Sequence, residues 1–447
     1  MYSFMSTATP DLVLQDLFRD IRRRLDQVPA ESLARATGFL RRSPRKIPIP
    51  ALLAALIALG SETVLSLERI AQVIGLAANR SYSKQAFHQR LSARIEGFLT
   101  RVAAALLQST ATPPDPSGWL TRFPRVLLQD STCEPLPKHL ADAFPGSKNQ
   151  RRRKSGTLKL QFITELLGGS VLHWALSGFT RNDQAASVDI LPIAQPGDLI
   201  LRDLGFFSLK VFRDLDRLGA YFLSRCKQGL NFYDPLSGKK LALIQLLKNH
   251  PRWDGWVLVG EEKVRLRLVI EPVSDAVANE RRRRAHLNRD RRLNPGKETL
   301  FLMGWNLFLT NVPAKVWPPK ALFWVYRLRW RIEILFKSWK SHLRFVEFNQ
   351  RNELMVRLSV LTKLLFCLLT ANLSDTLESL CGQQRQVSLL RVARVMGQCA
   401  CLFAAALLRL TPAQWLAHQV REHLFYEKRP DRKNFHQLVK FVDAGLT

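Results

Sequence analysis

The sequence predicts an α/β fold with helical regions at both ends of the chain. Three observations lead to this prediction. Short apolar runs alternate with helix-like segments between residues 120 and 228, which is the pattern of a sheet covered by helices. Residues 229–320 are rich in strand-like runs. Residues 1–110 and the chain from residue 322 onward have helical composition and apolar spacing.

The N-terminal part carries the first helical pattern. Helix-like segments occur at residues 51–59, 65–76 and 83–106. Ser83 is a suitable N-cap for the third segment, and residues 75–79 form the turn before it. A helix, a turn and a polar helix are equally typical of a DNA-binding helix-turn-helix and of an ordinary helical hairpin. The proline-rich residues 112–118 then indicate a domain boundary.

Two apolar runs further along the chain each end in an aspartate. Residues 125–130 end in Asp130 and residues 199–203 end in Asp203, so each run predicts a buried strand followed by an acid. The remaining predicted strands are residues 157–167, 171–177 and 221–225, and the remaining predicted helices are 184–193 and 208–218. Strands that alternate with helices in this way favour a mixed α/β layer.

The pattern changes after residue 228. Strand-like runs occur at residues 255–260, 264–273 and 300–312, and a basic helix is predicted at 279–292. This change, from strands that alternate with helices to a segment of mainly strand-like runs, predicts a separate inserted unit. The helical pattern resumes at residue 322.

Charge indicates the kind of partner. The chain contains 67 Lys and Arg against 37 Asp and Glu, for a formal net charge of +30. Solubility alone needs a net charge of only about 2–8. The excess therefore indicates a polyanionic partner, usually a nucleic acid.

Cysteines and apolar stretches indicate the compartment. None of the six cysteines forms a CxxC pair or a zinc-type cluster, so we expect small core residues in a reducing compartment. The longest apolar stretches are residues 47–60, too short to span a bilayer, and 359–373, which contains Lys363. No secretory signal opens the sequence. We expect a cytoplasmic protein without membrane contact.

A charged stripe marks the segment from residue 326 to residue 340. On a helix, Tyr326, Arg329, Glu333, Lys337 and Lys340 fall on one face, and large apolar side chains fill most of the rest. Charged groups on an apolar helix are costly unless they meet a polar site. Composition alone supports a solvent-facing stripe equally well.

The spacing of this stripe resembles a known signature. Tyr326, Arg329, Glu333 and Lys340 match the Y-(2)-R-(3)-E-(6)-K pattern of the insertion sequence four family of DDE transposases. Asp130 in LLQDSTC and Asp203 in LILRDLGFFS resemble the first two acids of that family's triad. The resemblance covers roughly residues 45–375. It implies that Asp130, Asp203 and Glu333 are catalytic and hold Mg²⁺, with Mn²⁺ as a substitute.

The resemblance also implies an architecture. A ribonuclease-H-like catalytic core would be interrupted by a β-rich insertion and flanked by helical N- and C-terminal regions. The predicted units are residues 1–115 for a helical DNA-binding region, 120–228 and 321–375 for the two parts of the core, 229–320 for the insertion and 376–447 for the C-terminal helices. Three carboxylates can supply the hard oxygen ligands that a two-metal site needs.

Further residues are expected to contact DNA. The resemblance assigns Tyr326, Arg329 and Lys340 to phosphates of the DNA end, and Lys337 shares their face. In the family, a tryptophan of the insertion holds a flipped base. Asn306 aligns with that tryptophan, and Trp305 lies one residue before it, so Trp305 is a candidate for this role. The alternative is that Trp305 packs in the core. The remaining candidates are Lys84, Gln85, Gln89 and Arg90 for end recognition, and the basic runs 148–154 and 281–284.

These observations predict a cut-and-paste transposase. Its partners would be double-stranded DNA, as terminal inverted repeats and as target, and a second copy in a synaptic homodimer at the bacterial nucleoid. A catalytically silent DNA-binding relative and a metal nuclease without strand transfer are the alternatives. The complete triad argues against the first, since a DNA binder has no need of three acids.

Overall fold

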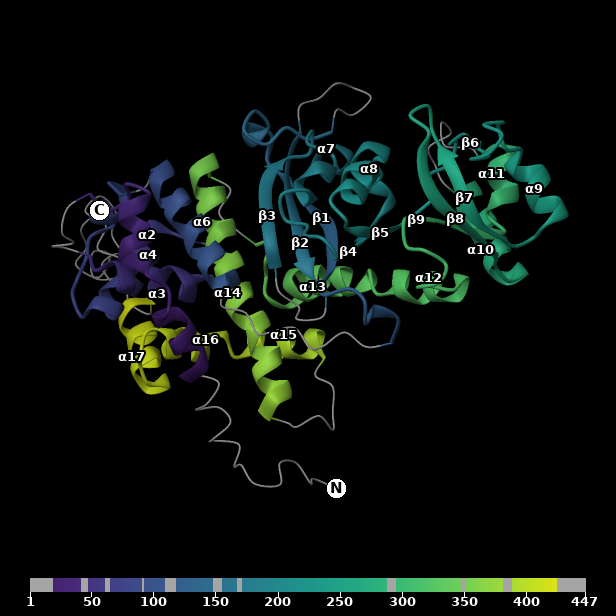
Figure 1. The fold of residues 1–447 in the computed structure, drawn as a ribbon. Coiled ribbons are helices and arrows are strands. Elements are labelled where there is room, and N and C mark those ends of the chain that lie inside the picture. Colours follow the sequence, from purple (N-terminus) through teal and green to yellow (C-terminus); the bar gives the residue numbers. More distant parts are fainter. Residues whose placement is uncertain are drawn as a thin grey trace, which may run out of the picture.

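A computed structural model provides the structure of the protein (Figure 1). It describes residues 19–423 apart from 42–46, 61–64, 91, 109–117, 148–154, 167–170, 288–294, 348–350 and 381–387. The basic run 148–154 therefore lies outside the described residues. A helical body lies at one end of the molecule, and a sheet extends from its middle to the other end. No described helix is long and apolar enough to cross a membrane.

The centre of the molecule is a sheet of mixed direction. Its strands are β1 (Val126–Leu136), β2 (Gly156–Glu165), β3 (Val171–Gly178), β4 (Leu199–Arg202) and β5 (Tyr221–Arg225). They lie side by side in the order β3-β2-β1-β4-β5. The neighbours β1, β2 and β3 are antiparallel, whereas β4 is parallel to β1 and β5 is parallel to β4.

Both faces of this sheet are buried at β4, which explains why its first three residues are all apolar. Ile200 packs with Val211 and Phe212 of α8 (Leu209–Arg217) on one face. Leu199 and Leu201 belong to the core on the other face, which includes the helix α13 (Trp330–His342). A strand buried on both sides is a continuous hydrophobic run. The runs that predict strands at 199–203 and 221–225 are therefore confirmed by β4 and β5.

The segment after residue 228 extends the same sheet. Its strands are β6 (Phe232–Tyr233), β7 (Trp253–Val259), β8 (Val264–Pro272) and β9 (Trp305–Thr310), and its helices are α9 (Leu243–Asn249), α10 (Asp275–His286) and α11 (Lys297–Leu302). Strand β9 pairs with β5 on one side and with β8 on the other. The nine strands are thus hydrogen-bonded into one sheet, although this part projects well beyond β5 in Figure 1.

The arginine run 281–284 on α10 is largely engaged within the chain. Arg281 donates to the carbonyl oxygens of Met303 and Trp305, and Arg282 donates to that of Leu300. Arg283 and Arg284 both pair with Glu280. Much of the donor capacity of this run therefore stabilises α10 and its packing.

The helical body combines both ends of the chain. Its N-terminal helices are α2 (Ala30–Ala36), α3 (Ile49–Leu59), α4 (Leu67–Ala78), α5 (Lys84–His88) and α6 (Ala93–Gln108). Its C-terminal helices are α14 (Glu353–Leu380), α15 (Leu389–Gln398), α16 (Ala400–Leu407) and α17 (Pro412–His423). Helix α14 packs on α3 and α6, and α16 packs on α3. Residues far apart in the sequence thus share one core.

Several elements differ from their predictions. The helix predicted at 83–106 is two helices, α5 and α6, and the turn predicted at 75–79 is helical up to Ala78, where Asn79 in the left-handed region ends α4. The helix predicted at 184–193 is only the short α7 (Asp183–Ala186) followed by a 3-10 turn. Strand β1 continues six residues past Asp130, so this acid does not end its strand.

Gly397 allows α15 to pack closely against α13. A Cβ atom at Gly397 would overlap the carbonyl oxygen of His342 at the C-terminal end of α13. We expect Gly397→Ala to lower the free energy of unfolding by about 1–3 kcal/mol, because a backbone atom cannot rotate away as a side chain can. Chemical denaturation measures this change.

Gly97→Ala is the matched control, since Gly97 also lies inside a helix. Its Cβ atom would have only an ordinary contact at 3.9 Å from Thr37. This variant should gain up to about 1 kcal/mol from better helix propensity. A Gly397→Ala protein as stable as the Gly97→Ala protein would contradict the close packing of α15 on α13.

Candidate active site

The parallel pairing of β1 and β4 brings Asp130 and Asp203 together. Gln129 pairs with Arg202 at the end of the parallel ladder, and each aspartate directly follows that pair. Because side chains alternate along a strand, Gln129 lies on one face of the sheet and Asp130 on the other. Asp203 leaves the sheet at this point and caps a 3-10 turn by accepting a hydrogen bond from the Gly205 amide at 3.4 Å.

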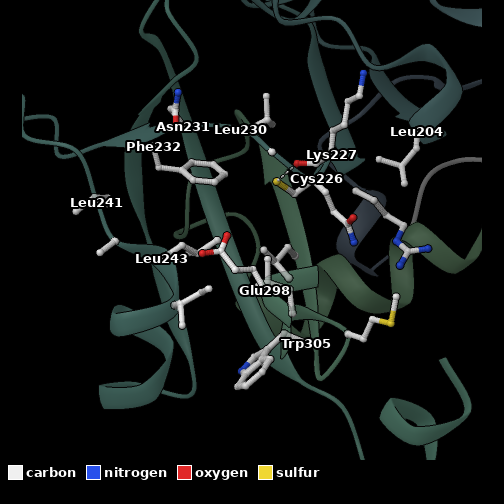
Figure 2. A pocket seen from close by; sticks show the side chains of 18 of the residues that line it. Leu204, Cys226, Lys227, Leu230, Asn231, Phe232, Leu241, Leu243, Glu298 and Trp305 are labelled. Atoms are coloured by element: carbon white, nitrogen blue, oxygen red, sulfur yellow. Dashed lines mark hydrogen bonds between the residues drawn. The ribbon is translucent and has the colours of Figure 1, made fainter. Parts of the chain in front are cut away.

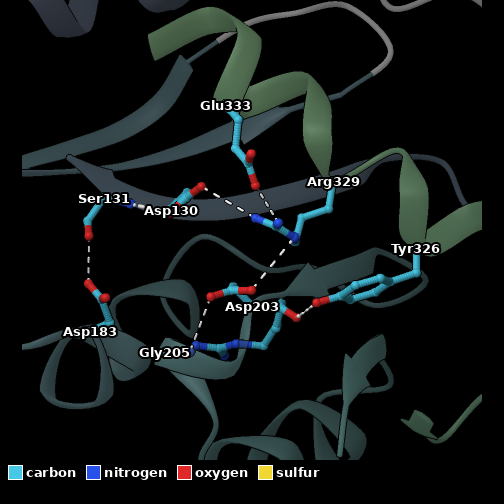
Figure 3. Close-up of polar contacts among 9 residues, drawn as sticks. Asp130, Ser131, Asp183, Asp203, Gly205, Tyr326, Arg329 and Glu333 are labelled. Atoms are coloured by element: carbon cyan, nitrogen blue, oxygen red, sulfur yellow. Dashed lines mark hydrogen bonds and ion pairs between the residues drawn. The ribbon is translucent and has the colours of Figure 1, made fainter. Parts of the chain in front are cut away.

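Arg329, the residue directly before α13, joins these acids to Glu333. Its Nη1 lies 3.6 Å from Oδ2 of Asp130 and its Nε lies 3.8 Å from Oδ1 of Asp203. Its Nη2 donates to Glu333 one helical turn away, as Figure 3 shows. Since a guanidinium is a small planar group, the nearest oxygens of any two of these acids lie within about 10 Å of each other. The structure therefore brings Asp130, Asp203 and Glu333 together.

Burial decides the charge of Asp130. Loss of solvent around the carboxyl raises its pKa from 3.8 to about 6. The Ser131 amide and Arg329 lower this pKa, whereas the nearby charges of Asp203 and Glu333 raise it. Only 18% of the Asp130 side chain is exposed, against 40% for Asp203 and 45% for Glu333. Ionisation of Asp130 is thus costly in the folded protein.

Tyr326 and Arg329 share this electrostatic environment. Burial, and then the charge of Asp203, raises the pKa of Tyr326 to about 12, so the phenol is a hydrogen-bond donor at neutral pH. Its hydroxyl donates to the carbonyl oxygen of Arg202 at 3.3 Å. Burial acts to lower the pKa of Arg329, but Tyr326, Asp203 and Glu333 outweigh it and raise the pKa. The guanidinium therefore stays charged among the acids.

A second network of hydrogen bonds and ion pairs, which the sequence alone does not predict, holds the segments around the acids. The Ser131 amide donates to Asp130, and the Ser131 hydroxyl donates to Asp183 Oδ1 at 2.7 Å. The same Asp183 oxygen lies 2.7 Å from Nζ of the buried Lys159 on β2. A Cβ atom on Gly205 would lie only 2.9 Å from Asp183 Oδ2. Asp183 thus contacts Ser131, which follows Asp130, and lies close to Gly205, two residues after Asp203. Nothing in its local sequence distinguishes it from an ordinary acid in a helix's first turn.

On the opposite face of the sheet, Arg202 stabilises the same two strands. Its guanidinium is fully buried, donates to Gln129 at 2.8 Å and to the Ser187 carbonyl oxygen at 3.0 Å, and has its pKa lowered by burial to about 9. Gln129 donates in turn to the carbonyl oxygen of Ala186. These bonds connect β1, β4 and the turn after α7 directly beneath the acids.

The last residue of the charged stripe lies apart from the acids. Lys340 Nζ donates to the carbonyl oxygen of Cys133 at 3.0 Å and lies 3.4 Å from Glu134 Oε2. It therefore contacts the far half of β1. Lys337 is exposed on the same helix. Of the stripe residues, Tyr326, Arg329 and Glu333 lie together with the aspartates, and Lys340 does not.

A cavity of about 1020 Å³ adjoins the site (Figure 2). Leu204, next to Asp203, and Trp305 on β9 both line it, and Arg225 and Lys227 supply positive charge. The Trp305 indole donates to the Pro251 carbonyl oxygen at 2.9 Å. Trp305 is thus held in place while one side of it borders the cavity. Its neighbour Asn306 accepts a hydrogen bond from Arg281.

The donor chemistry of the site fits a hard divalent cation. Three carboxylates from β1, the end of β4 and α13 already surround one positive charge, the guanidinium of Arg329. Oxygen ligands of this kind suit Mg²⁺. In the described part of the chain, no group of three or more His, Cys, Asp or Glu side chains lies in an arrangement that could already hold a metal ion.

Of the residues predicted to recognise DNA ends, Lys84 and Gln85 lie on α5, and Gln89 and Arg90 directly follow it. Ser83 caps this helix by accepting a hydrogen bond from the Ala86 amide, so the predicted N-cap is confirmed. Phe87 anchors the helix in the core. Lys84, Gln85 and Gln89 are exposed, whereas Arg90 is half-buried and burial lowers its pKa.

Comparison with known proteins identifies the family. The family model described as "Transposase DDE domain" matches residues 121–369, more than half of the chain. The transposase for insertion sequence element IS231D of Bacillus thuringiensis subsp. finitimus is 26% identical over 352 residues, 73% of each chain. The transposase for IS1151 of Clostridium perfringens is 27% identical over 226 residues, 46% of this chain and 47% of the relative. The cryo-EM structure of a piggyBac transposase synaptic complex with hairpin DNA aligns with 99% of this chain and 90% of that chain, at 10% identity and a TM-score of 0.39.

The raised pKa of Asp130 predicts a pH dependence of stability. The unfolded carboxyl loses its proton near pH 4 and the folded one near pH 6. The contribution of the buried neutral acid is complete below about pH 4 and is lost as pH rises to about 6, which amounts to about 2–3 kcal/mol. Denaturant titrations in EDTA from pH 4 to pH 7 should show this fall in wild type. It should be absent from Asp130→Asn, and equal pH profiles for the two proteins would refute the shift.

Proposed function

The chain belongs to the DDE transposase family, and on that premise we propose that it cuts the ends of a mobile DNA element and joins them to target DNA. One observation carries the proposal. Three carboxylates from separate elements face a single guanidinium in a strongly basic chain. An acidic site in a protein of net charge +30 suits the chemistry of phosphodiesters, where metal cations mediate between acids and DNA.

We also propose that strands β1 to β5, with α8 and α13, form a ribonuclease-H-like core. The order β3-β2-β1-β4-β5, in which three antiparallel strands are followed by two parallel ones, supports this. In this proposal the core consists of residues 120–228 and 321–375, and residues 229–320 are a β-rich insertion. Residues 1–115 and 376–447 are the helical N- and C-terminal regions.

Asp130, Asp203 and Glu333 would hold Mg²⁺, or Mn²⁺ in its place. The bound ions supply activation of the attacking oxygen and stabilisation of the leaving oxygen. The protein positions the ligands: the β1–β4 register sets the two aspartates, and Ser131, Asp183 and Lys159 hold the segments around them. Arg329 supplies a cation at the same place, suited to a phosphate of the incoming DNA.

The proposed reaction has two phosphoryl transfers. In the first, water oxygen bonds to phosphorus at the element's end and the bond to the 3′ oxygen breaks, which leaves a 3′-hydroxyl. In the second, that 3′-hydroxyl attacks phosphorus in another strand and displaces that strand's own 3′ oxygen. Both displacements place negative charge beside Arg329, whose guanidinium stays protonated because of the acids around it.

Other residues would bind the DNA. We propose Tyr326, Arg329, Lys337 and Lys340 as contacts to end phosphates, and Trp305 with its cavity as a place for an unpaired base. Lys84, Gln85, Gln89 and Arg90 on or beside α5 would help to recognise terminal inverted repeats; the exposure of the first three supports this. Two ends must meet, so we propose a homodimer in the synaptic complex, in the cytoplasm at the nucleoid.

Neutralising the acids tests the chemistry. We expect Asp203→Asn or Glu333→Gln to lower cleavage of an end-containing duplex by at least about a hundredfold, because transition-state charge loses its stabilisation. Binding of the duplex should remain. Glu262→Gln is the control, an exposed acid paired with Arg213, and should cleave as wild type does. Full cleavage by both site variants would refute the proposal, whereas joining of a pre-cleaved end separates a transposase from a simple nuclease.

A salt series tests the proposed phosphate contact of Lys340. Removing one phosphate contact lowers the slope of log affinity against log salt by about one. Lys340→Ala should show this shallower slope, and part of its cleavage should return at high protein and DNA concentration, whereas Glu333→Gln recovers nothing. An unchanged slope together with reduced thermal stability would instead show that Lys340 acts only through its bond to β1.

A further inference from the structure

A buried lysine forms an ion pair close to the candidate site. Lys159 lies in the middle of β2, and only 3% of its side chain is exposed. Its Nζ atom lies 2.7 Å from Oδ1 of Asp183 and 5.6 Å from the ring centroid of Phe179. A buried ion pair often stabilises a fold no more than two apolar side chains of similar volume would. The Lys159–Asp183 pair therefore points to a role beyond the stability of the sheet.

This pair lies on the opposite face of the sheet from Asp130. Asp130 is in register with Phe162, which packs against α13. Because side chains alternate along a strand, Ser131 and Lys159 both lie on the other face. Asp183 therefore reaches the two aspartates from behind the sheet, through the residues between them.

Asp183 contacts the segments that carry both aspartates. Its Oδ1 accepts a hydrogen bond from the Ser131 hydroxyl at 2.7 Å, and the Ser131 amide donates to Asp130 at 2.7 Å, as Figure 3 shows. Its Oδ2 lies only 2.9 Å from the place that a Cβ atom on Gly205 would take. The Gly205 amide in turn donates to Asp203. One carboxylate thus contacts a residue that is hydrogen-bonded to each of the two acids.

Asp183 is itself badly placed to bind a metal ion. Its Oδ1 already accepts from the Ser131 hydroxyl and faces the Lys159 ammonium. A divalent cation that approached this oxygen would be repelled by the ammonium at short range. The carboxylate is therefore suited to holding neighbouring groups in place.

We propose that Asp183 is a positioning residue for the metal site. The buried Lys159 ammonium fixes its carboxylate, and the carboxylate holds the backbone beside Asp130 and Asp203 so that both acids can bind the same cation. The inference rests on the proposed function, in which these acids hold Mg²⁺ or Mn²⁺. Side chains that orient metal ligands typically change metal affinity by about 10–100-fold.

Metal affinity, measured apart from catalysis, tests the inference. The sample is full-length protein bound to a duplex with a pre-cleaved end. Electron paramagnetic resonance of free Mn²⁺ reports binding, and Asp203→Asn gives the background. Ser131→Ala removes one hydroxyl and leaves the Lys159–Asp183 pair in place. We expect it to raise the Mn²⁺ concentration for half-saturation by about tenfold, with unchanged affinity for the duplex in EDTA. Ser131→Thr keeps a hydroxyl and should restore most of the Mn²⁺ affinity.

A double variant separates positioning from stability. Lys159→Met with Asp183→Leu replaces the ion pair by apolar side chains of similar volume. Its melting temperature in EDTA should equal or exceed that of wild type. The net charge of the protein does not change, so the salt dependence of duplex binding should not change either. The Mn²⁺ concentration for half-saturation should nevertheless rise by about 10–100-fold.

A second ion pair provides the matched control. Arg267 on β8 is 1% exposed and pairs with Asp254 on β7, which is 26% exposed, whereas Lys159 and Asp183 are 3% and 30% exposed. Two strands separate β8 from β4 in the sheet. Arg267→Met with Asp254→Leu therefore removes a pair of the same kind away from the acids, and should bind Mn²⁺ as wild type does.

Several results would overturn the inference. Wild-type Mn²⁺ affinity of the double variant or of Ser131→Ala would show that the network serves the fold alone. Loss of Mn²⁺ binding at every concentration in the double variant, as in Asp203→Asn, would make Asp183 a ligand. If the double variant does not fold, the comparison of Ser131→Ala with Ser131→Thr decides. A wild-type protein that binds no more Mn²⁺ than Asp203→Asn does would instead refute the proposed function, so the two failures are distinguishable.

Discussion

The candidate site depends on the ion pairs between Arg329 and three carboxylates. Asp130, Asp203 and Glu333 come from places in the chain separated by up to about two hundred residues, and like charges repel at short range. Arg329 stays protonated and offsets one of the three charges. With all three acids ionised, the group keeps a net charge of −2, and protonation of Asp130 below about pH 6 lowers it to −1. The residual negative charge is what favours divalent cations at this place.

The rest of the fold determines whether these groups meet. Arg202 and Gln129 fix the register of β4 against β1 from the far side of the sheet. Helix α13 is held on the near side by its apolar face, and at its C-terminal end by α15, where Gly397 permits close contact with His342. The C-terminal helices thus support α13 although they lie outside the charged stripe. A protein in which α13 shifted by one turn would separate Glu333 from both aspartates.

Local sequence predicts some of these features and necessarily misses others. Strands β4 and β5 are short and begin with three apolar or aromatic residues each, so composition alone marks them. The second half of β1 is not marked, because residues 131–136 are mostly polar and pair only with β2, after β4 has ended. Pro135 fits there since its missing amide faces no partner strand on that side. The division between α5 and α6 escapes a periodicity argument because apolar spacing continues across it, although serine at position 92 suits a new helix start.

A single sequence cannot show which residues that are far apart in the chain contact each other in the fold. Asp183 in α7 follows an ordinary cap, Asn182, and only the fold shows that it contacts Ser131 and Lys159. The charged stripe from Tyr326 to Lys340 has the same difficulty: its spacing indicates a shared face, but the fold places Tyr326 on α12 (Pro319–Arg327), and it separates Lys340, which contacts β1, from Glu333. Apolar composition does not show which side chains are buried either. Ile332 and Ile334 are the same residue type on one helix, and only Ile332 is buried. The exposed apolar side chains of α13, Trp330 and Ile334, are therefore visible only once its buried face is known, because burial accounts for Ile332, Leu335, Phe336 and Trp339 and leaves these two beside the acids.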